Sequence, residues 1–413
     1  MMEYPLLSRL ARSGLKAGLL PLALVFACAK GVSAQSFAPN ETRVSAESEL
    51  VDPEYSQSRA QFTWVDRSGR LWIGNIDRRT GQFLPPDGRG ILVDPASMST
   101  NDIRVVGNGP EWISTSAGEQ IVYTRFLPGQ PRTMATARLA MALEQGDGTW
   151  IPSTLDDLPR NAPYASRDPG DAQPRISYID ELGNHYWRNL FEPASETLVP
   201  GYPPSFWVSM RFVDGERATV FRGPDPRGRA QVFKYWLDTG TVEQLTWDNG
   251  HSGIRSAAWM WRAPEFNNEH VLATVANQNR ELRIYRKLNP TGRKWSVVRT
   301  ITAPNGGTIS SPEPFVHLGF SYLFMSLNPA GAQEPTGIAV ASIDPARPLF
   351  RKVTPDDDTR VRKDPELFIT ENGVFLYYNR FNPALTTTGP GDLIVCDACN
   401  EGIWRSNIGM RVQ

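Results

Sequence analysis

Short segments in which apolar and polar residues alternate recur along most of the chain. Residues 120–126 (QIVYTRF), 320–326 (FSYLFMS) and 374–379 (VFLYYN) are examples. Alternation with a period of two is typical of a β-strand that buries one face. No helical period is sustained beyond residue 34, and the 34 Gly and 34 Pro residues occur along the whole length. We therefore expect an all-β protein with many short strands and few helices.

The strands belong to a unit that occurs seven times. Each unit begins with a proline that is followed, in most units, by Glu and then by an aromatic or aliphatic residue. These prolines are Pro53, Pro110, Pro163, Pro204, Pro264, Pro312 and Pro365. They lie 41 to 60 residues apart, and a period of about 50 residues is typical of a propeller blade. Further strands follow in each unit, for example at 281–287 and 295–302.

The repeats predict an all-β, seven-bladed β-propeller over residues 50–413, with four-stranded antiparallel blades. Six blades would result if the short unit between Pro163 and Pro204 belonged to a neighbour. The ring should be closed, because an open ring would expose two sheet edges. We expect the N-terminal arm, residues 35–49, to supply a closing strand to the last blade, and we expect a monomer.

One segment carries a resemblance to a known family. Residues 231–250 (QVFKYWLDTGTVEQLTWDNG) resemble the repeat of TolB-type, WD40-like propellers, with Asp-Thr-Gly at 238–240 as the turn and Leu-Thr at 245–246 in the closing strand. The resemblance implies a propeller and, as one function, a scaffold for protein interactions. Residues 311–327 and 364–381 are similar to strands of arabinanase-type glycoside hydrolases, which use three separated carboxylates around the propeller axis.

The first 34 residues have the features of a signal peptide. Basic residues precede an apolar run at 17–29, and Val-Ser-Ala at 32–34 fits cleavage before Gln35. The run is shorter than the roughly 20 residues of a membrane-spanning helix. Two alternatives are a retained anchor and a lipoprotein in which Cys28 carries the lipid. We expect a secreted or periplasmic protein whose mature chain has no membrane span.

Charge and cysteine content narrow the functions further. The formal net charge is −1, and removal of residues 1–34 makes it more negative, so a nucleic-acid partner is not expected. Cys396 and Cys399 form a Cys-Asp-Ala-Cys sequence, which in an exported protein predicts a disulfide across a turn. No second cysteine pair is present for a zinc site.

Carboxylates are the main candidates for a functional site. The inner strand of each blade lines the axis of a propeller, which places there the glutamates that follow the repeat prolines. They are Glu54, Glu111, Glu265, Glu313 and Glu366. Such a group could bind Ca²⁺, bind a cationic or polyhydroxylated ligand, or supply the acid and base of glycoside or uronide chemistry. Each Glu could instead accept backbone hydrogen bonds from the neighbouring blade.

Roles within this group differ. We assign Glu54 and Glu111 to ligand binding, and Glu265, Glu313 and Glu366 are the candidates for catalysis. His251, in a Gly-flanked loop, is a fourth catalytic candidate, or it is a solvated loop residue. No metal cofactor is predicted, with Ca²⁺ as the alternative.

Aromatic and basic residues add to the predicted site. Trp259 and Trp261 alternate and therefore share a face near the channel mouth, where they could stack on sugar rings or pack between blades. Arg262 could bind a carboxylate. We therefore expect a propeller that binds a carbohydrate-type ligand at the mouth of its channel. The alternatives are a glycoside hydrolase or polysaccharide lyase with axial carboxylates, and a TolB-like scaffold with a protein partner.

Overall fold

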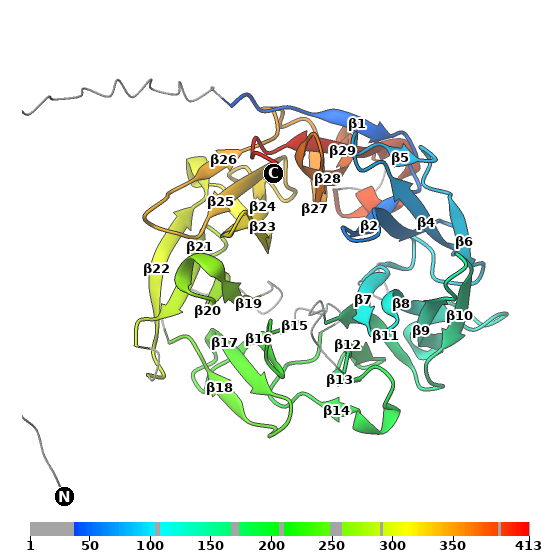
Figure 1. The fold of residues 1–413 in the computed structure, drawn as a ribbon, viewed down its shortest axis with the longest axis horizontal. Coiled ribbons are helices and arrows are strands. Elements are labelled where there is room, and N and C mark those ends of the chain that lie inside the picture. Colours follow the sequence, from blue (N-terminus) through cyan, green and yellow to red (C-terminus); the bar gives the residue numbers. More distant parts are fainter. Residues whose placement is uncertain are drawn as a thin grey trace, which may run out of the picture. The chain divides into compact units, whose positions relative to one another are not determined.

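The computed structural model describes residues 37–103, 108–166, 173–205, 210–247, 258–289, 292–386 and 390–412. All of them except Phe37 belong to one compact unit, Ala38–Gln413. The larger unit contains seven antiparallel sheets that follow one another around a ring (Figure 1). This is the predicted seven-bladed β-propeller, and the six-bladed alternative is wrong.

The first three blades run outward from an inner strand. Blade 1 consists of β2 (Val51–Ser56), β3 (Gln61–Val65), β4 (Leu71–Ile76) and β5 (Phe83–Leu84), with β6 (Ile91–Asp94) also pairing with β4. Blade 2 consists of β7 (Glu111–Thr115), β8 (Gly118–Phe126), β9 (Ala137–Glu144) and β10 (Trp150–Thr154). Blade 3 consists of β11 (Arg160–Ala165), β12 (Arg175–Asp180), β13 (His185–Asn189) and β14 (Thr197–Leu198).

The next three blades repeat this order. Blade 4 consists of β15 (Arg211–Phe212), β16 (Ala218–Pro224), β17 (Ala230–Trp236) and β18 (Val242–Gln244). Blade 5 consists of β19 (Ala258–Ala263), β20 (Glu269–Ala276), β21 (Glu281–Lys287) and β22 (Trp295–Thr302). Blade 6 consists of β23 (Thr308–His317), β24 (Phe320–Asn328), β25 (Gly337–Ser342) and β26 (Phe350–Lys352).

Blade 7 combines strands from both ends of the described chain. It contains β27 (Val361–Thr370), β28 (Gly373–Phe381), β29 (Asn400–Asn407) and, at its outer edge, β1 (Thr42–Ser45), which pairs antiparallel with β29. Next to β1, the carboxylate of Glu41 forms ion pairs with the fully buried Arg362 (2.7 Å) and with Arg380 (3.0 Å). This pairing joins residues from the two ends of the described chain in one sheet.

Short 3₁₀ segments connect some of the strands. They are η1 (Met134–Thr136), η2 (Pro193–Ser195), η3 (Pro264–Phe266), η4 (Pro304–Gly306), η5 (Pro383–Leu385), η6 (Pro390–Val395) and η7 (Asp397–Cys399). Cys396 and Cys399 form the predicted disulfide beside η7. Among the described residues, no helix is long and apolar enough to cross a bilayer.

Four inner strands share a β-bulge at the repeat proline. The residue before this proline has a positive φ of 45–51° in blades 1, 3, 6 and 7, at Asp52, Ala162, Ser311 and Asp364. A residue before proline is normally extended, and positive φ is uncommon without glycine. A proline has no N–H to donate, so it fits an inner strand that has one unpaired edge. The inner strands of these four blades therefore have the same backbone conformation at the bulge.

The apolar core lies mainly between neighbouring blades. Trp112, Ile121 and Trp150 of blade 2 pack with Leu71 and Ile73 of blade 1 in one buried cluster. A second cluster joins β19 and β20 of blade 5 to β24 and β25 of blade 6. Because each blade buries its faces against the next, the inner strands are held in fixed positions around the axis.

Candidate functional site

A cavity of about 200 Å³ lies among the inner strands of six blades. Its wall is formed by residues in or next to the inner strands β2, β7, β11, β15, β23 and β27. We call it the axial acidic pocket, because six carboxylates line it. They are Asp52, Glu54, Glu111, Glu313, Asp364 and Glu366.

The repeat explains how these side chains come together. Asp52 and Asp364 are the positive-φ residues of the bulges in blades 1 and 7, and Glu54 and Glu366 follow two positions later. Blade 6 has Ser311 at the bulge and Glu313 after it, and both line the pocket. The same Pro-Glu sequence on neighbouring inner strands thus gathers the acids at one place on the axis.

Burial and like charges perturb Asp52 most strongly. Desolvation by burial raises the pKa of Asp52 well above its usual range, and the nearby carboxylates of Asp364, Glu111 and Glu313 raise it further. The backbone N–H of Gly109 donates a hydrogen bond to Asp52 and works in the opposite direction. Part of the Asp52 side chain faces the pocket, although protein surrounds it. The raised pKa favours the protonated form of Asp52, in which the carboxyl group is a hydrogen-bond donor.

Asp364 is perturbed in the same direction. Burial raises its pKa, the carboxylate of Glu334 adds to the effect, and the ammonium group of Lys363 opposes it. Asn108 donates a hydrogen bond to Glu111 Oε1 (3.2 Å) and another to the carbonyl of Pro163 (2.7 Å). The pocket therefore brings two carboxyl groups with raised pKa values, Asp52 and Asp364, together with the hydrogen-bonded Glu111.

Arg211 is the one basic residue in the pocket wall, as far as the structure describes it. Its guanidinium carbon lies 4.0 Å from the ring centre of Tyr164 and 5.0 Å from that of Trp259. Both aromatic rings favour a cation at this distance. Tyr164 and Trp259 also line a neighbouring cavity of about 180 Å³, so the two cavities share a wall at Tyr164.

Four predicted glutamates meet in the axial acidic pocket, but Glu265 does not. The expectation that Glu265 faces the axis is wrong, because Pro264 and Glu265 form η3 after β19 has ended. The carboxylate of Glu265 accepts hydrogen bonds from the backbone N–H (2.9 Å) and the hydroxyl (3.0 Å) of Ser321 in β24. It therefore links blade 5 to blade 6.

The two predicted tryptophans offer little open surface for stacking. Trp259 is 9% exposed and Trp261 is 7% exposed, and both belong to the buried cluster between blades 5 and 6. Trp261 Nε1 donates to Ser321 Oγ (3.2 Å). Neighbouring blades cover these rings, so their expected role as an open platform at the channel mouth is not supported.

Arg262 lies away from the axial acidic pocket, and the structure does not describe His251. Arg262 is exposed and lies against Gly215, whose carbonyl accepts a hydrogen bond from it (3.5 Å). It lines a cleft between blades 4 and 5 instead of the axial acidic pocket. His251 lies outside the described residues.

Sequence reasoning missed Asp52, Asp364 and Arg211. Asp-Pro occurs at the bulge in blades 1 and 7, and this repeated dipeptide was a readable signal for the two aspartates. Nothing local to Arg211 marks it, because it is placed by Tyr164 and Trp259 from other blades. Among the described residues, no group of three or more His, Cys, Asp or Glu side chains is arranged to hold a metal ion.

No protein-family model matches the chain, and no curated protein matches it. Solved structures similar to it include TolB from Acinetobacter baumannii (14% identity, 84% of this chain and 78% of that chain, TM-score 0.38). An ancestral GH74 enzyme has 11% identity over 88% of this chain and 48% of that chain, with a TM-score of 0.49. Sqt1 from Saccharomyces cerevisiae has 13% identity over 83% and 84%, with a TM-score of 0.48.

A second similar structure is that of a putative TolB from Agrobacterium tumefaciens, with 13% identity over 61% of this chain and 81% of that chain and a TM-score of 0.38. With identities of 11–14% and TM-scores of 0.38–0.49, these structures assign no function to this chain. The seven-bladed architecture follows from the strand pairing of this chain, and the site from its own side chains.

Proposed function

We propose that this protein is an exported propeller that binds a small ligand with a cationic group in the axial acidic pocket. The observation that carries the proposal is the acidic wall of that cavity, in which six carboxyl groups, four of them from Glu side chains, face one guanidinium group. A cavity with an excess of one sign attracts the opposite charge. Its volume of about 200 Å³ is below the roughly 300–1,000 Å³ of pockets for larger ligands, so the ligand should be small.

The raised pKa of Asp52, beside the other carboxyl groups of the pocket, favours a ligand that has hydroxyl groups as well as an amine. A protonated Asp52 can donate a hydrogen bond, and ionised carboxylates beside it accept hydrogen bonds. An amino sugar carries an ammonium group and hydroxyls on one ring, and it therefore matches both kinds of partner. This refines the expectation of a carbohydrate-type ligand.

Acid–base catalysis on a sugar is the second candidate function. It is favoured by one observation, the raised pKa of Asp52 next to the carboxylates of Glu111 and Glu313. Glycosidases pair a protonated carboxyl group with an ionised one. Release of a product from an oligosaccharide, abolished by Asp52→Asn, would favour this function over binding alone.

Export is part of the proposal and has its own support. Residues 1–34 have the composition of a signal peptide, and disulfides such as Cys396–Cys399 persist mainly in oxidising compartments. Detection of the Gln35 N-terminus on protein recovered from the exported fraction of a producing cell would support it. A chain that retains residues 1–34 in the cytosol would contradict it.

Calorimetry with glucosamine, N-acetylglucosamine and glucose tests the proposed function. Glucosamine should bind at pH 7, and the two neutral sugars should bind about tenfold more weakly or not at all, because they lack the ammonium group. Glu111→Gln and Glu313→Gln should each weaken glucosamine binding by about tenfold or more, since a hydrogen bond to a charged group contributes about 1.5–3 kcal/mol.

The control variant is Glu371→Gln, at an exposed glutamate between β27 and β28. It removes the same charge outside the pocket and should leave the affinity unchanged. An equal loss of affinity for charged and neutral sugars in Glu111→Gln, or unchanged glucosamine binding in both pocket variants, would contradict a cation-selective axial site.

A further inference from the structure

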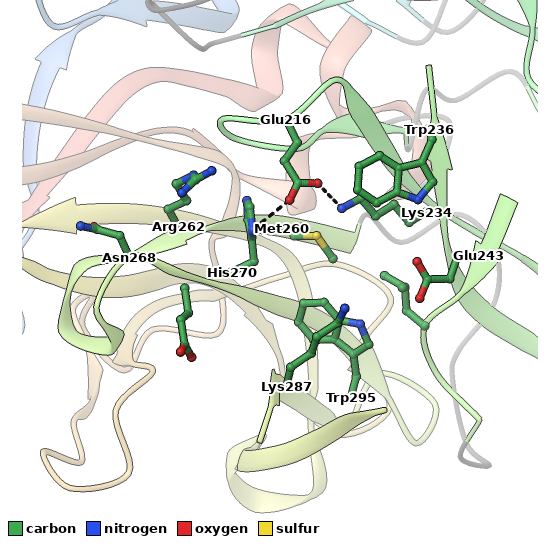
Figure 2. Close-up of a pocket in the computed structure, with 12 residues that line it drawn as sticks. Glu216, Lys234, Trp236, Glu243, Met260, Arg262, Asn268, His270, Lys287 and Trp295 are labelled. Atoms are coloured by element: carbon green, nitrogen blue, oxygen red, sulfur yellow. Dashed lines mark hydrogen bonds and ion pairs between the residues drawn. The ribbon is translucent and has the colours of Figure 1, made fainter. Parts of the chain in front are cut away.

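A second cavity, of about 320 Å³, lies between blades 4 and 5. We call it the interblade cleft. Two tryptophans belong to its wall, Trp236 from β17 and Trp295 from β22, and Met260 and Leu245 add apolar surface. In Figure 2 Trp236 lies above Trp295, with Met260 to the left and Glu243 to the right in this view.

One side of the cleft is held in place by a connected set of polar contacts. The Glu216 carboxylate forms an ion pair with Lys234 and contacts His270 Nδ1 at 3.2 Å (Figure 2). His270 Nε2 donates to the carbonyl of Asp214 (2.8 Å). Lys234 is buried, and its ammonium group lies 3.8 Å from the ring centre of Trp236. These contacts restrict the side chains before any ligand arrives, which lowers the cost of binding.

Other polar groups in the cleft keep hydrogen-bonding capacity. Within the described chain, the side chains of Glu243, Asn268 and Lys287 have no hydrogen bond or ion pair to another residue. Lys287 has only a ring contact, with its ammonium group 5.6 Å from the centre of Trp295. Together they offer an acceptor, an amide and a donor around the aromatic wall.

The charges of the cleft cancel, in contrast to those of the axial acidic pocket. Lys234, Arg262 and Lys287 are its cations, and Glu216, Glu243 and Glu269 are its carboxylates. Equal numbers of both signs give no strong preference for a charged ligand. Selection then rests on apolar contact with the indoles and on hydrogen bonds to the polar rim.

We propose that the interblade cleft binds a neutral carbohydrate ring. A pyranose has C–H faces that pack against aromatic surface, and its hydroxyls are both donors and acceptors, so it matches indoles surrounded by carboxylate, amide and ammonium groups. A planar aromatic ligand would use the indoles but would leave the polar rim unpaired. The site is separate from the axial acidic pocket and does not depend on the function proposed there.

Saturation-transfer NMR and calorimetry with glucose, mannose, galactose, N-acetylglucosamine and their β-linked tetrasaccharides test this site. At least one of these neutral sugars should bind the wild-type protein. Glu243→Gln should weaken that binding about tenfold or more, because it removes a charged acceptor. Trp236→Ala should weaken it by a similar factor or abolish it.

Trp404→Ala is the matched control for Trp236→Ala. Trp404 is also half-buried, and Arg380 lies 3.7 Å from its ring centre, but it belongs to β29 in blade 7. It should leave sugar binding unchanged. Glu243→Gln guards against misfolding as the cause of a loss, because within the described residues the Glu243 side chain has no hydrogen bond or ion pair to lose, only a charge interaction with Lys234.

The outcomes separate this proposal from the axial one. Neutral-sugar binding that is lost in Glu243→Gln and kept in Glu111→Gln supports the interblade cleft. No binding by any sugar of the panel at millimolar concentration overturns it. Binding that is unchanged in both Glu243→Gln and Trp236→Ala, or that is lost in Glu111→Gln instead, overturns it as well.

Discussion

Asp52 is the residue of the axial acidic pocket whose pKa is raised most strongly by burial and by neighbouring carboxylates. Protein surrounds it, three other carboxylates raise its pKa, and one backbone N–H from Gly109 opposes them. Natural proteins seldom bury such a group without a function, because an uncompensated carboxylate destabilises the fold. The same physics makes its contribution to stability depend on pH.

Asp52→Asn should change the pH dependence of unfolding. The folded-state pKa of Asp52 lies above its unfolded value, so its contribution to stability is present at acidic pH and is lost as pH rises through the raised pKa. Because asparagine does not ionise, the variant does not lose stability in this way as pH rises. It should therefore gain stability relative to wild type between pH 4 and pH 8, on the order of 1 kcal/mol, in denaturant titrations at several pH values.

Asp87→Asn, at an exposed carboxylate, controls for the removal of a negative charge. A difference between Asp52→Asn and wild type that stays constant from pH 4 to pH 8 would show that Asp52 is not perturbed as described.

At the scale of elements, the close approach of β1 to β29 depends on one glycine. Gly402 has a φ of +86°, and a Cβ atom there would lie 2.1 Å from the carbonyl oxygen of Ser45. The register of the pair shifts at the same place, between Arg43 and Ser45. A side chain at position 402 would therefore push β1 away from the last blade.

Gly402→Ala should destabilise the fold more than Gly118→Ala. Both glycines have positive φ, but a Cβ at Gly118 would meet nothing within 4 Å. The difference in unfolding free energy between the two variants measures the cost of the clash with β1. We expect this difference to be about 1–3 kcal/mol, the usual cost of overpacking. Chemical denaturation measures it. Equal losses in the two variants would mean that β1 can move aside without cost.

Elements also show how far sequence reasoning could go. The alternation at 281–287 and 295–302 gave the bounds of β21 and β22, because strands that bury one face carry a regular period. The repeat predicted that Pro264 and Glu265 lie in an inner strand, but they form a turn after that strand has ended. A Pro-Glu pair is compatible with both a strand bulge and such a turn. Local sequence does not state where the strand ends.

At the scale of the whole molecule, the ring arrangement of the blades brings the Glu residues of a repeated Pro-Glu dipeptide into the wall of one cavity. Glu54, Glu111, Glu313 and Glu366 come from four blades and line one pocket, as the repeat suggested. Arg211 could not be foreseen, since its position depends on packing against aromatic rings of blades 3 and 5. The same holds for the interblade cleft, whose tryptophans come from two blades.

The central claim is that the axial acidic pocket holds the cationic group of a small ligand. A crystal structure of the protein soaked with glucosamine tests it most directly. We expect density for the sugar on the propeller axis, with its ammonium group in contact with the carboxylates of Glu111 or Glu313. Ordered glucosamine elsewhere with an axial pocket that holds only water, or a sugar whose ammonium group points away from every carboxylate, would contradict it.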